Sequence, residues 1–166
     1  PHLGADCLEA RPGLAVEALR RGIPLVYLYV GELDHTGHAH GWRSVRWLEQ
    51  LERLDAALAG LARRVPAGTR IILTADHGMV DTGPDRRIDV SARPALSRDV
   101  VAVADRHLGP VGQRAAGVVG DVLVAMSREW VAVDPRVHSE SAMAMPGVHG
   151  SLTRAETTVP LLTVLT

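Results

Sequence analysis

Two short apolar runs, residues 24–30 (PLVYLYV) and 70–75 (RIILTA), flank a long stretch of helical periodicity. Apolar runs of this length that are rich in β-branched and aromatic residues predict strands buried on both faces, as in a parallel sheet. Between them, from residue 42 to residue 65, leucines and valines recur every three or four positions, which predicts an amphipathic helix. A strand, a helix and a strand in this order predict a right-handed βαβ crossover with two parallel strands.

The remaining segments carry weaker patterns. Residues 31–41 are polar and interrupted by glycine, which predicts a loop at the carboxyl end of the first strand. Helices are expected at 12–21 and 98–107. Strands are expected at 87–90, 121–126, 130–133 and 159–165, with 121–126 and 130–133 as the two arms of a hairpin. The alternation of helices and buried strands predicts the α/β class, with a layered, mainly parallel sheet and an antiparallel excursion.

The bulk composition excludes several classes of protein. The 166 residues are 46% hydrophobic and 22% charged, which is typical of one soluble globular domain spanning 1–166. The net charge of −1 indicates neither a nucleic-acid-binding surface nor a polybasic membrane patch. We find no apolar run near the roughly 20 residues of a membrane span and no signal peptide, and we expect no membrane segment. The single cysteine, Cys7, rules out an intrachain disulfide and favours a cytoplasmic setting.

Potential metal ligands follow both of the strongly predicted strands. Asp34 and His38 are four residues apart, a spacing that puts both on one side of a helical turn. Asp76 and His77 come directly after the second strand, and His149 lies shortly before the last one. Ligands in open α/β sheets bind beyond the carboxyl ends of the strands, and a mixed set of Asp and His suits Zn²⁺, with Mn²⁺ or Fe²⁺ as further options.

Each of these residues also has a structural interpretation. Asp34 and His38 could cap the helix at 42–65, because Asp is common before a helix. Asp76 and His77 could form a hydrogen-bonded loop, and His149 could be an ordinary loop histidine.

Three motifs in order resemble the ligand motifs of the alkaline phosphatase superfamily. They are GELDxxxHxxG at 31–41, TADHGM at 74–79 and GVHG at 147–150. The similarity is greatest to the nucleotide pyrophosphatase/phosphodiesterase branch, and the closing residues 151–162 also look like the end of those domains. The resemblance implies a three-layer α/β/α sandwich, alkaline-phosphatase-like, with a mainly parallel sheet.

The resemblance also implies two Zn²⁺ ions that take part in the hydrolysis of a phosphodiester or pyrophosphate bond. Asp34, His38 and His149 would hold one ion. Asp76 and His77 would hold the other, together with an earlier Asp and a Thr or Ser nucleophile. The substrate would be a small-molecule phosphodiester or nucleotide.

The chain departs from the superfamily pattern at its N-terminus. Residues 1–23 contain no Ser or Thr and no strand that ends in Asp. We therefore expect the chain to be the C-terminal part of a longer domain, with the nucleophile upstream. Without upstream strands the sheet would expose an edge, which predicts self-association. The alternatives are a metal-dependent phosphomutase or sulfatase of the same superfamily, and an inactive metal-binding module that lacks the nucleophile.

Overall fold

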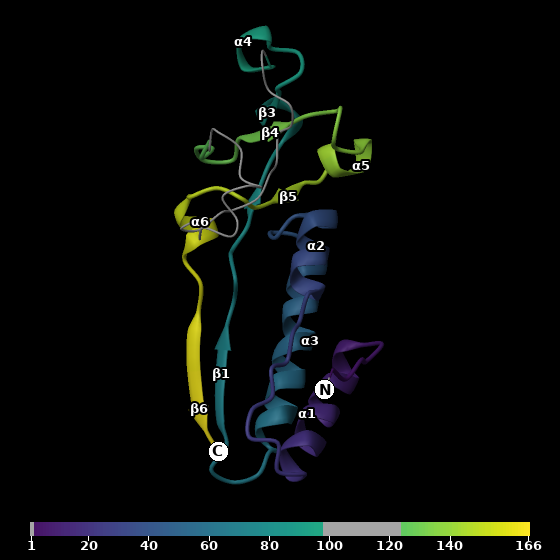
Figure 1. Ribbon diagram of the computed structural model, residues 1–166, viewed down its shortest axis with the longest axis vertical. Coiled ribbons are helices and arrows are strands. Elements are labelled where there is room, and N and C mark those ends of the chain that lie inside the picture. The colour runs from purple at the N-terminus through teal and green to yellow at the C-terminus, as the bar shows by residue number, and fades with distance from the viewer. Residues whose placement is uncertain (1, 98–123) are drawn as a thin grey trace. The chain divides into compact units, whose positions relative to one another are not determined.

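The computed structural model describes residues 2–97 and 124–166, which form two compact units (Figure 1). The first unit consists of residues 1–76 and 159–166, and the second of residues 77–158. Both contain helices together with short strands, so the chain is of the mixed α/β kind that the sequence predicts.

The first unit contains three α-helices, which include the two expected from the sequence. A 3-10 turn η1 (Leu8–Ala10) leads into α1 (Arg11–Arg20), and α2 (Glu32–His40) and α3 (Val45–Ala62) follow. The α3 helix begins after Ser44, whose hydroxyl oxygen accepts a hydrogen bond from the backbone N–H of Trp47 at 3.1 Å. The helix is therefore a few residues shorter at each end than the apolar pattern at 42–65 suggests.

The core of the first unit lies where α1 and α3 meet the strand β1 (Arg70–Thr74). Ala15 and Val16 of α1 and Leu61 of α3 are buried there. Partly buried apolar side chains surround them: Val26, Leu28, Leu58, Val65 and Ile71. These side chains come from both helices, from β1 and from the segment before α2, so the apolar faces read from the sequence do pack against one another.

The strand β1 pairs with β6 (Leu161–Leu165) and not with residues 24–30. The pairing is antiparallel, from Arg70 opposite Leu165 to Thr74 opposite Leu161 (Figure 1). Residues 24–30 form no strand, so the predicted parallel crossover is wrong for the described part of the chain. This segment is not buried on both faces either. Val26 and Leu28 pack on the core, whereas Leu25 and Tyr27 are 82% and 86% exposed.

Much of the β1–β6 pair is exposed, and on the face of Ile71 this includes Leu162 and Val164, at 57% and 51%. Ile71 packs inward, while Ile72 is 61% exposed on the opposite face, which Leu161 and Leu165 share through their register with β1. Both of these leucines are also exposed, at 71% and 69%. We call Ile72, Leu161 and Leu165 the outer apolar face. A sheet whose two faces are both apolar is typical of a strand layer covered by helices on each side.

The second unit is built from short elements. They are β2 (Val80–Asp81), η2 (Pro84–Arg86), β3 (Arg87–Asp89), α4 (Pro94–Ser97), β4 (Val131–Val133), α5 (Glu140–Met143), β5 (Gly147–Val148) and α6 (Arg154–Thr157). β2 pairs antiparallel with β5, and β3 pairs parallel with β4. The strand expected at 87–90 is confirmed as β3.

The expected hairpin differs from the structure in the arm that is described. Residues 131–133 form β4, but their partner is β3 and the pairing is parallel. Residues 124–126 are not in a strand, while 121–123 and the helix expected at 98–107 lie outside the described residues. The apolar run at 130–133 predicted this strand, but it carries no information about the strand's partner.

A fully buried carboxylate lies at the end of β4. Asp134 has no exposed surface and forms a bidentate ion pair with Arg136, whose Nη2 is 2.6 Å from Asp134 Oδ2. The backbone N–H of Arg136 also donates to Asp134. The Arg136 guanidinium is the main reason why the pKa of Asp134 falls from 3.8 to about 2. Asp134 therefore fixes the turn that follows β4.

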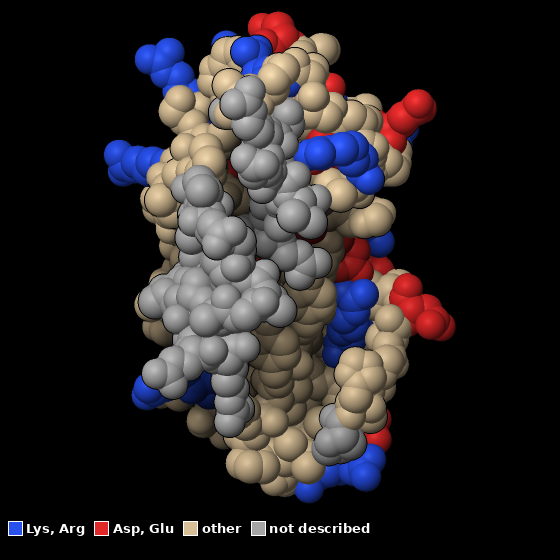
Figure 2. Space-filling view, turned by 45° about the horizontal axis from the view of Figure 1, so that its top comes forward, with Lys and Arg blue, Asp and Glu red and all other residues tan. Residues whose placement is uncertain are grey.

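Arginine and acidic side chains are interspersed on the face of the molecule that Figure 2 shows. All 18 basic residues are arginine, and 19 residues are acidic. In residues 2–97 and 124–166, no helix combines the length and the apolar character that crossing a membrane requires.

The outer apolar face predicts self-association of the isolated 166-residue polypeptide. Replacing Ile72 and Leu165 together by Thr removes apolar surface worth about 1.5–3 kcal/mol per side chain when buried, and we expect the self-association constant to fall by tenfold or more. Sedimentation velocity over a concentration series measures it. The control is Val45→Thr, which changes an exposed residue of α3. A wild-type chain that stays monomeric throughout contradicts the prediction.

The buried Asp134 predicts a dependence of stability on pH. Because the pKa of this carboxyl is lower in the folded state, its contribution is fully present above the ordinary value of 3.8 and is lost as the pH falls toward about 2. Asp134→Asn should be less stable than wild type at pH 6, and the difference should shrink as the pH falls through that window. Urea unfolding at several pH values measures the difference, with the exposed Asp55→Asn as control. A difference that is the same at every pH would refute the prediction.

Candidate metal centre

The first pair of predicted ligands lies on α2. Residues 31–41 were expected to form a loop, but Glu32–His40 are helical, and Gly41 ends the helix with a φ of 83°. The helix places Asp34 and His38 on one face, where His38 Nε2 is 3.3 Å from Asp34 Oδ1. Both side chains are half-buried. The four-residue spacing therefore brings these two groups together as predicted.

An ion pair connects α2 to α1. Arg11 reaches Glu32, in the first turn of α2, with both ends of its guanidinium, at 2.7 and 2.8 Å. The hydrogen bonds from Arg11 are the main reason why the pKa of Glu32 lies below its ordinary value. A bidentate pair of this kind fixes direction as well as distance, so it helps to orient the helix that carries Asp34 and His38.

His77 and His149, two further predicted ligands, come together in the second unit through the pairing of β2 with β5. We call them the histidine pair. Val80 pairs with Val148, and continuing this register by one residue places Met79 opposite His149. His77 is two residues from Met79 and so shares its face of the ladder, diagonally across from His149. The two imidazole rings stack with centroids 3.6 Å apart and an interplanar angle of 21°.

A hydrogen bond defines the tautomer of His77. Its Nδ1 lies 2.9 Å from the carbonyl oxygen of Gly78, and a carbonyl can only accept, so Nδ1 carries the proton. The neutral ring then has its lone pair on Nε2. This is the arrangement by which proteins prepare a histidine to bind a metal.

The chemistry of these donors fits a metal ion. The ligand nitrogens of His77 and His149 lie within 4.8 Å of each other, and both rings are half-buried. Zn²⁺ binds imidazole nitrogen at about 2.0–2.1 Å, so small shifts would bring both rings onto one ion or onto two neighbouring ions. Asp76 is exposed after β1, at the junction of the two units. How the five residues divide between two ions stays a prediction from the resemblance.

Sequence reasoning missed Glu156, which is only 3% exposed. Its carboxylate accepts hydrogen bonds from the backbone N–H groups of Ser151 and Thr153 at 2.9 and 3.3 Å, and one from the Thr153 hydroxyl. The spacing Thr153-x2-Glu156 is a capping-box signal that could have revealed the cap. Nothing in the spacing indicates that the carboxylate is buried beside the loop of His149.

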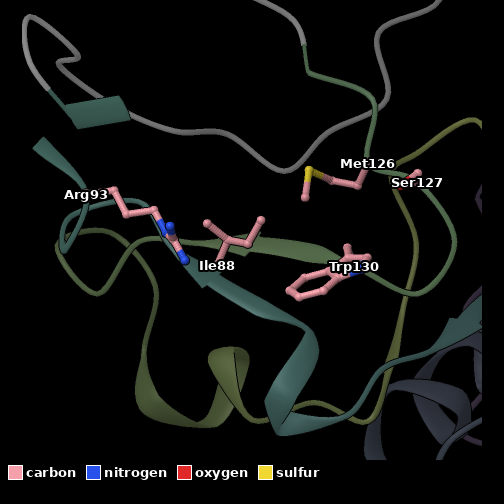
Figure 3. Close-up of a pocket in the computed structure, with 5 residues that line it drawn as sticks. All are labelled: Ile88, Arg93, Met126, Ser127 and Trp130. Carbon is pink, nitrogen blue, oxygen red and sulfur yellow. The ribbon is translucent and has the colours of Figure 1, made fainter. Parts of the chain in front are cut away.

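The second unit also contains an open hollow of about 350 Å³ (Figure 3). Its lining residues are Ile88, Arg93, Met126, Ser127 and Trp130. In Figure 3 the Arg93 side chain extends toward Ile88, and Met126 and Trp130 form the other end. The hollow is mostly apolar with one cationic group, and it shares no lining residue with the histidine pair.

Comparison with known families covers most of the chain. The family model of type I phosphodiesterase / nucleotide pyrophosphatase matches residues 9–122, more than half of the 166 residues. The chain belongs to this family. The match spans α2, α3, β1 and the TADHGM motif, so the resemblance seen in the sequence is confirmed for the family and, through it, for the alkaline phosphatase superfamily.

Individual relatives match a shorter stretch of this phosphodiesterase-family chain. The catalytic subunit of GPI ethanolamine phosphate transferase 3 from human is 35% identical over 63 residues, which are 36% of this chain and 6% of the relative. The mouse protein of the same name gives the same figures. The chain therefore matches only a small part of the length of these curated relatives. Family membership supports a phosphoryl-transfer enzyme of the phosphodiesterase kind.

The histidine pair predicts a measurable metal site. We expect the chain to bind Zn²⁺, and His149→Ala to lower the bound zinc by about one ion or the affinity by tenfold or more. The exposed His35→Ala, on α2, is the matched control and should leave zinc binding unchanged. Elemental mass spectrometry and competition with a chromophoric chelator measure content and affinity. Equal zinc binding by wild type and His149→Ala would contradict the prediction.

Proposed function

We propose that this chain supplies metal ligands to a zinc-dependent hydrolase of phosphodiester or pyrophosphate bonds. The observation that carries the proposal is the stacking of His77 on His149, two predicted ligands that are far apart in the chain. Membership in the type I phosphodiesterase / nucleotide pyrophosphatase family supports it independently. The substrate class is a small-molecule phosphodiester or nucleotide.

The proposed ligand sets follow the resemblance. Asp34, His38 and His149 hold one ion, and Asp76 and His77 hold the second together with an Asp from outside this set. Bound Zn²⁺, or Mn²⁺ or Fe²⁺ in its place, supplies Lewis-acid stabilisation of the charge that develops on phosphate oxygens. The nucleophile is a Thr or Ser that shares the second ion with Asp76 and His77.

The chain's own residues prepare this chemistry. Donation from His77 Nδ1 to the Gly78 carbonyl holds the ring in the tautomer that presents Nε2. Asp34 and His38 lie together on one face of α2, with a carboxylate oxygen and an imidazole nitrogen 3.3 Å apart as donors for one cation. The pair Arg11–Glu32 keeps that helix in place without bringing an uncompensated positive charge to it.

We propose a three-layer α/β/α sandwich with a mainly parallel sheet. The outer apolar face supports this, because Ile72, Leu161 and Leu165 are the kind of surface that a second helix layer covers. We also propose that residues 1–166 belong to a single domain and that the protein is cytoplasmic.

A second candidate is transfer of the phosphoryl-linked group to an acceptor other than water. It is favoured by the matched relatives, which are named as ethanolamine phosphate transferases. Phosphomutase or sulfatase activity and an inactive metal-binding module remain as further alternatives. The enzyme candidates differ in the acceptor or in the bond that is broken, and the inactive module differs from them in lacking the nucleophile.

A substrate panel on the full-length protein separates the candidates. We expect zinc-dependent cleavage of bis(p-nitrophenyl) phosphate or a nucleotide pyrophosphate, with slower cleavage of p-nitrophenyl phosphate and p-nitrophenyl sulfate. His77→Ala and His149→Ala should each reduce kcat/KM by about a hundredfold or more, and His35→Ala should not.

Other results of the substrate panel would identify one of the alternative functions. Faster sulfate cleavage indicates a sulfatase. Product release that rises with an added alcohol such as glycerol, with the phosphodiester of that alcohol as product, indicates a transferase. No turnover of any substrate by a protein that does bind zinc indicates the inactive module.

A further inference from the structure

The loops that carry His77 and His149 are joined a second time, beyond the β2–β5 ladder. The backbone N–H of Gly78, the residue after His77, donates to the carbonyl oxygen of Glu156 at 2.7 Å. A side chain at Gly78 would not fit there, because a Cβ at this position would overlap the carbonyl oxygen of Ala155. The start of the His77 loop therefore lies directly against the backbone of α6.

The Glu156 side chain holds the other loop. One of its oxygens accepts from the N–H of Ser151, two residues after His149, and the other accepts from the N–H and the hydroxyl of Thr153. Both oxygens are occupied, and the side chain is 3% exposed. Ser151 is itself buried, and its hydroxyl donates to the Met126 carbonyl, so the loop has little room to move on this side.

One short helix thus contacts both loops, through the backbone of Glu156 on one and its carboxylate on the other. Burying a carboxylate is costly unless it keeps its hydrogen bonds, and both oxygens of Glu156 accept them, which favours a single arrangement of the groups around it. Residues 77–81 alone could take other conformations, because they include Gly78 and are paired over only two residues.

We infer that Glu156 is a positioning residue which, together with the close approach of Gly78 to α6, fixes His77 and His149 in their stacked arrangement. Glu156 is not a metal ligand in this inference and acts through the two loops. Its consequence for metal binding rests on the proposed function. Its consequence for the histidine pair does not.

The test compares Glu156→Gln with two controls in the full-length protein. Glutamine has the same shape, but its amide nitrogen cannot accept a hydrogen bond, so the bonds to either Ser151 or Thr153 are lost. Glu140→Gln makes the same change at the start of α5, away from both loops. Val131→Ala removes buried apolar volume from β4, which belongs to neither loop, and controls for general loss of stability. Gly78→Ala tests the other half of the contact.

The first readout needs no metal. In metal-free protein labelled at histidine, nuclear Overhauser contacts between the rings of His77 and His149 should be present in wild type and in both controls. They should be lost or strongly reduced in Glu156→Gln and Gly78→Ala. If both of these variants fold and keep the ring contacts, the inference is overturned.

The second readout is the affinity for Zn²⁺, which should fall about tenfold in Glu156→Gln. The zinc affinity of Val131→Ala should stay within twofold of the wild-type value, even if urea unfolding shows this variant to be less stable than Glu156→Gln. An affinity that follows stability across all variants overturns the positioning role. Loss of the ring contacts in a protein whose wild type binds no zinc supports the inference and defeats the proposed metal function instead.

Discussion

The antiparallel pairing of β2 with β5 determines where the chemically distinctive residues of the second unit lie. Only two residue pairs form this ladder, yet its register places His77 and His149 on the same face as diagonal neighbours. A shift of one residue would turn one ring to the opposite face and separate the pair. So short a ladder has little stability of its own, and the further bonds from α6 to both loops supply the restraint that two pairs cannot.

The first unit depends on a different constraint, the packing of α1 and α3 on one face of β1. That packing buries Ala15, Val16 and Leu61 and aligns the segment before α2, because Val26 and Leu28 contribute to the same core. Arg11 then extends the same arrangement to α2 through Glu32. The position of Asp34 and His38 therefore follows from a core in which neither residue takes part. On the opposite face of the sheet, the described residues leave Ile72, Leu161 and Leu165 exposed.

The sequence predicted most accurately the features that depend on local periodicity. The leucine spacing identified α3, and the apolar run identified β1, because a single element determines each pattern. It was wrong about 31–41, since Gly37, Thr36 and the histidines are poor helix formers. Packing, the Arg11–Glu32 pair and the Asp34–His38 contact stabilise a helix there. It was also wrong about 24–30, where apolar residues on both faces indicated two-sided burial and the structure covers one side. The α3–β1 order predicted a parallel partner, but β6, from the far end of the chain, takes that place.

The sequence predicted which residues belong to the candidate site, but only partly how they lie relative to one another. Asp34 and His38 could be placed together because four residues span one helical turn, whereas the contact of His77 with His149 depends on a long-range register. Burial of acids is less predictable still. Asp134 and Glu156 look like ordinary surface residues in the sequence, and only the structure shows that one is held by Arg136 and the other by backbone N–H groups. Burying a carboxylate is unfavourable unless its oxygens accept hydrogen bonds. A buried carboxylate therefore identifies a turn whose conformation is fixed by those bonds. In this chain one of those two turns directly follows His149.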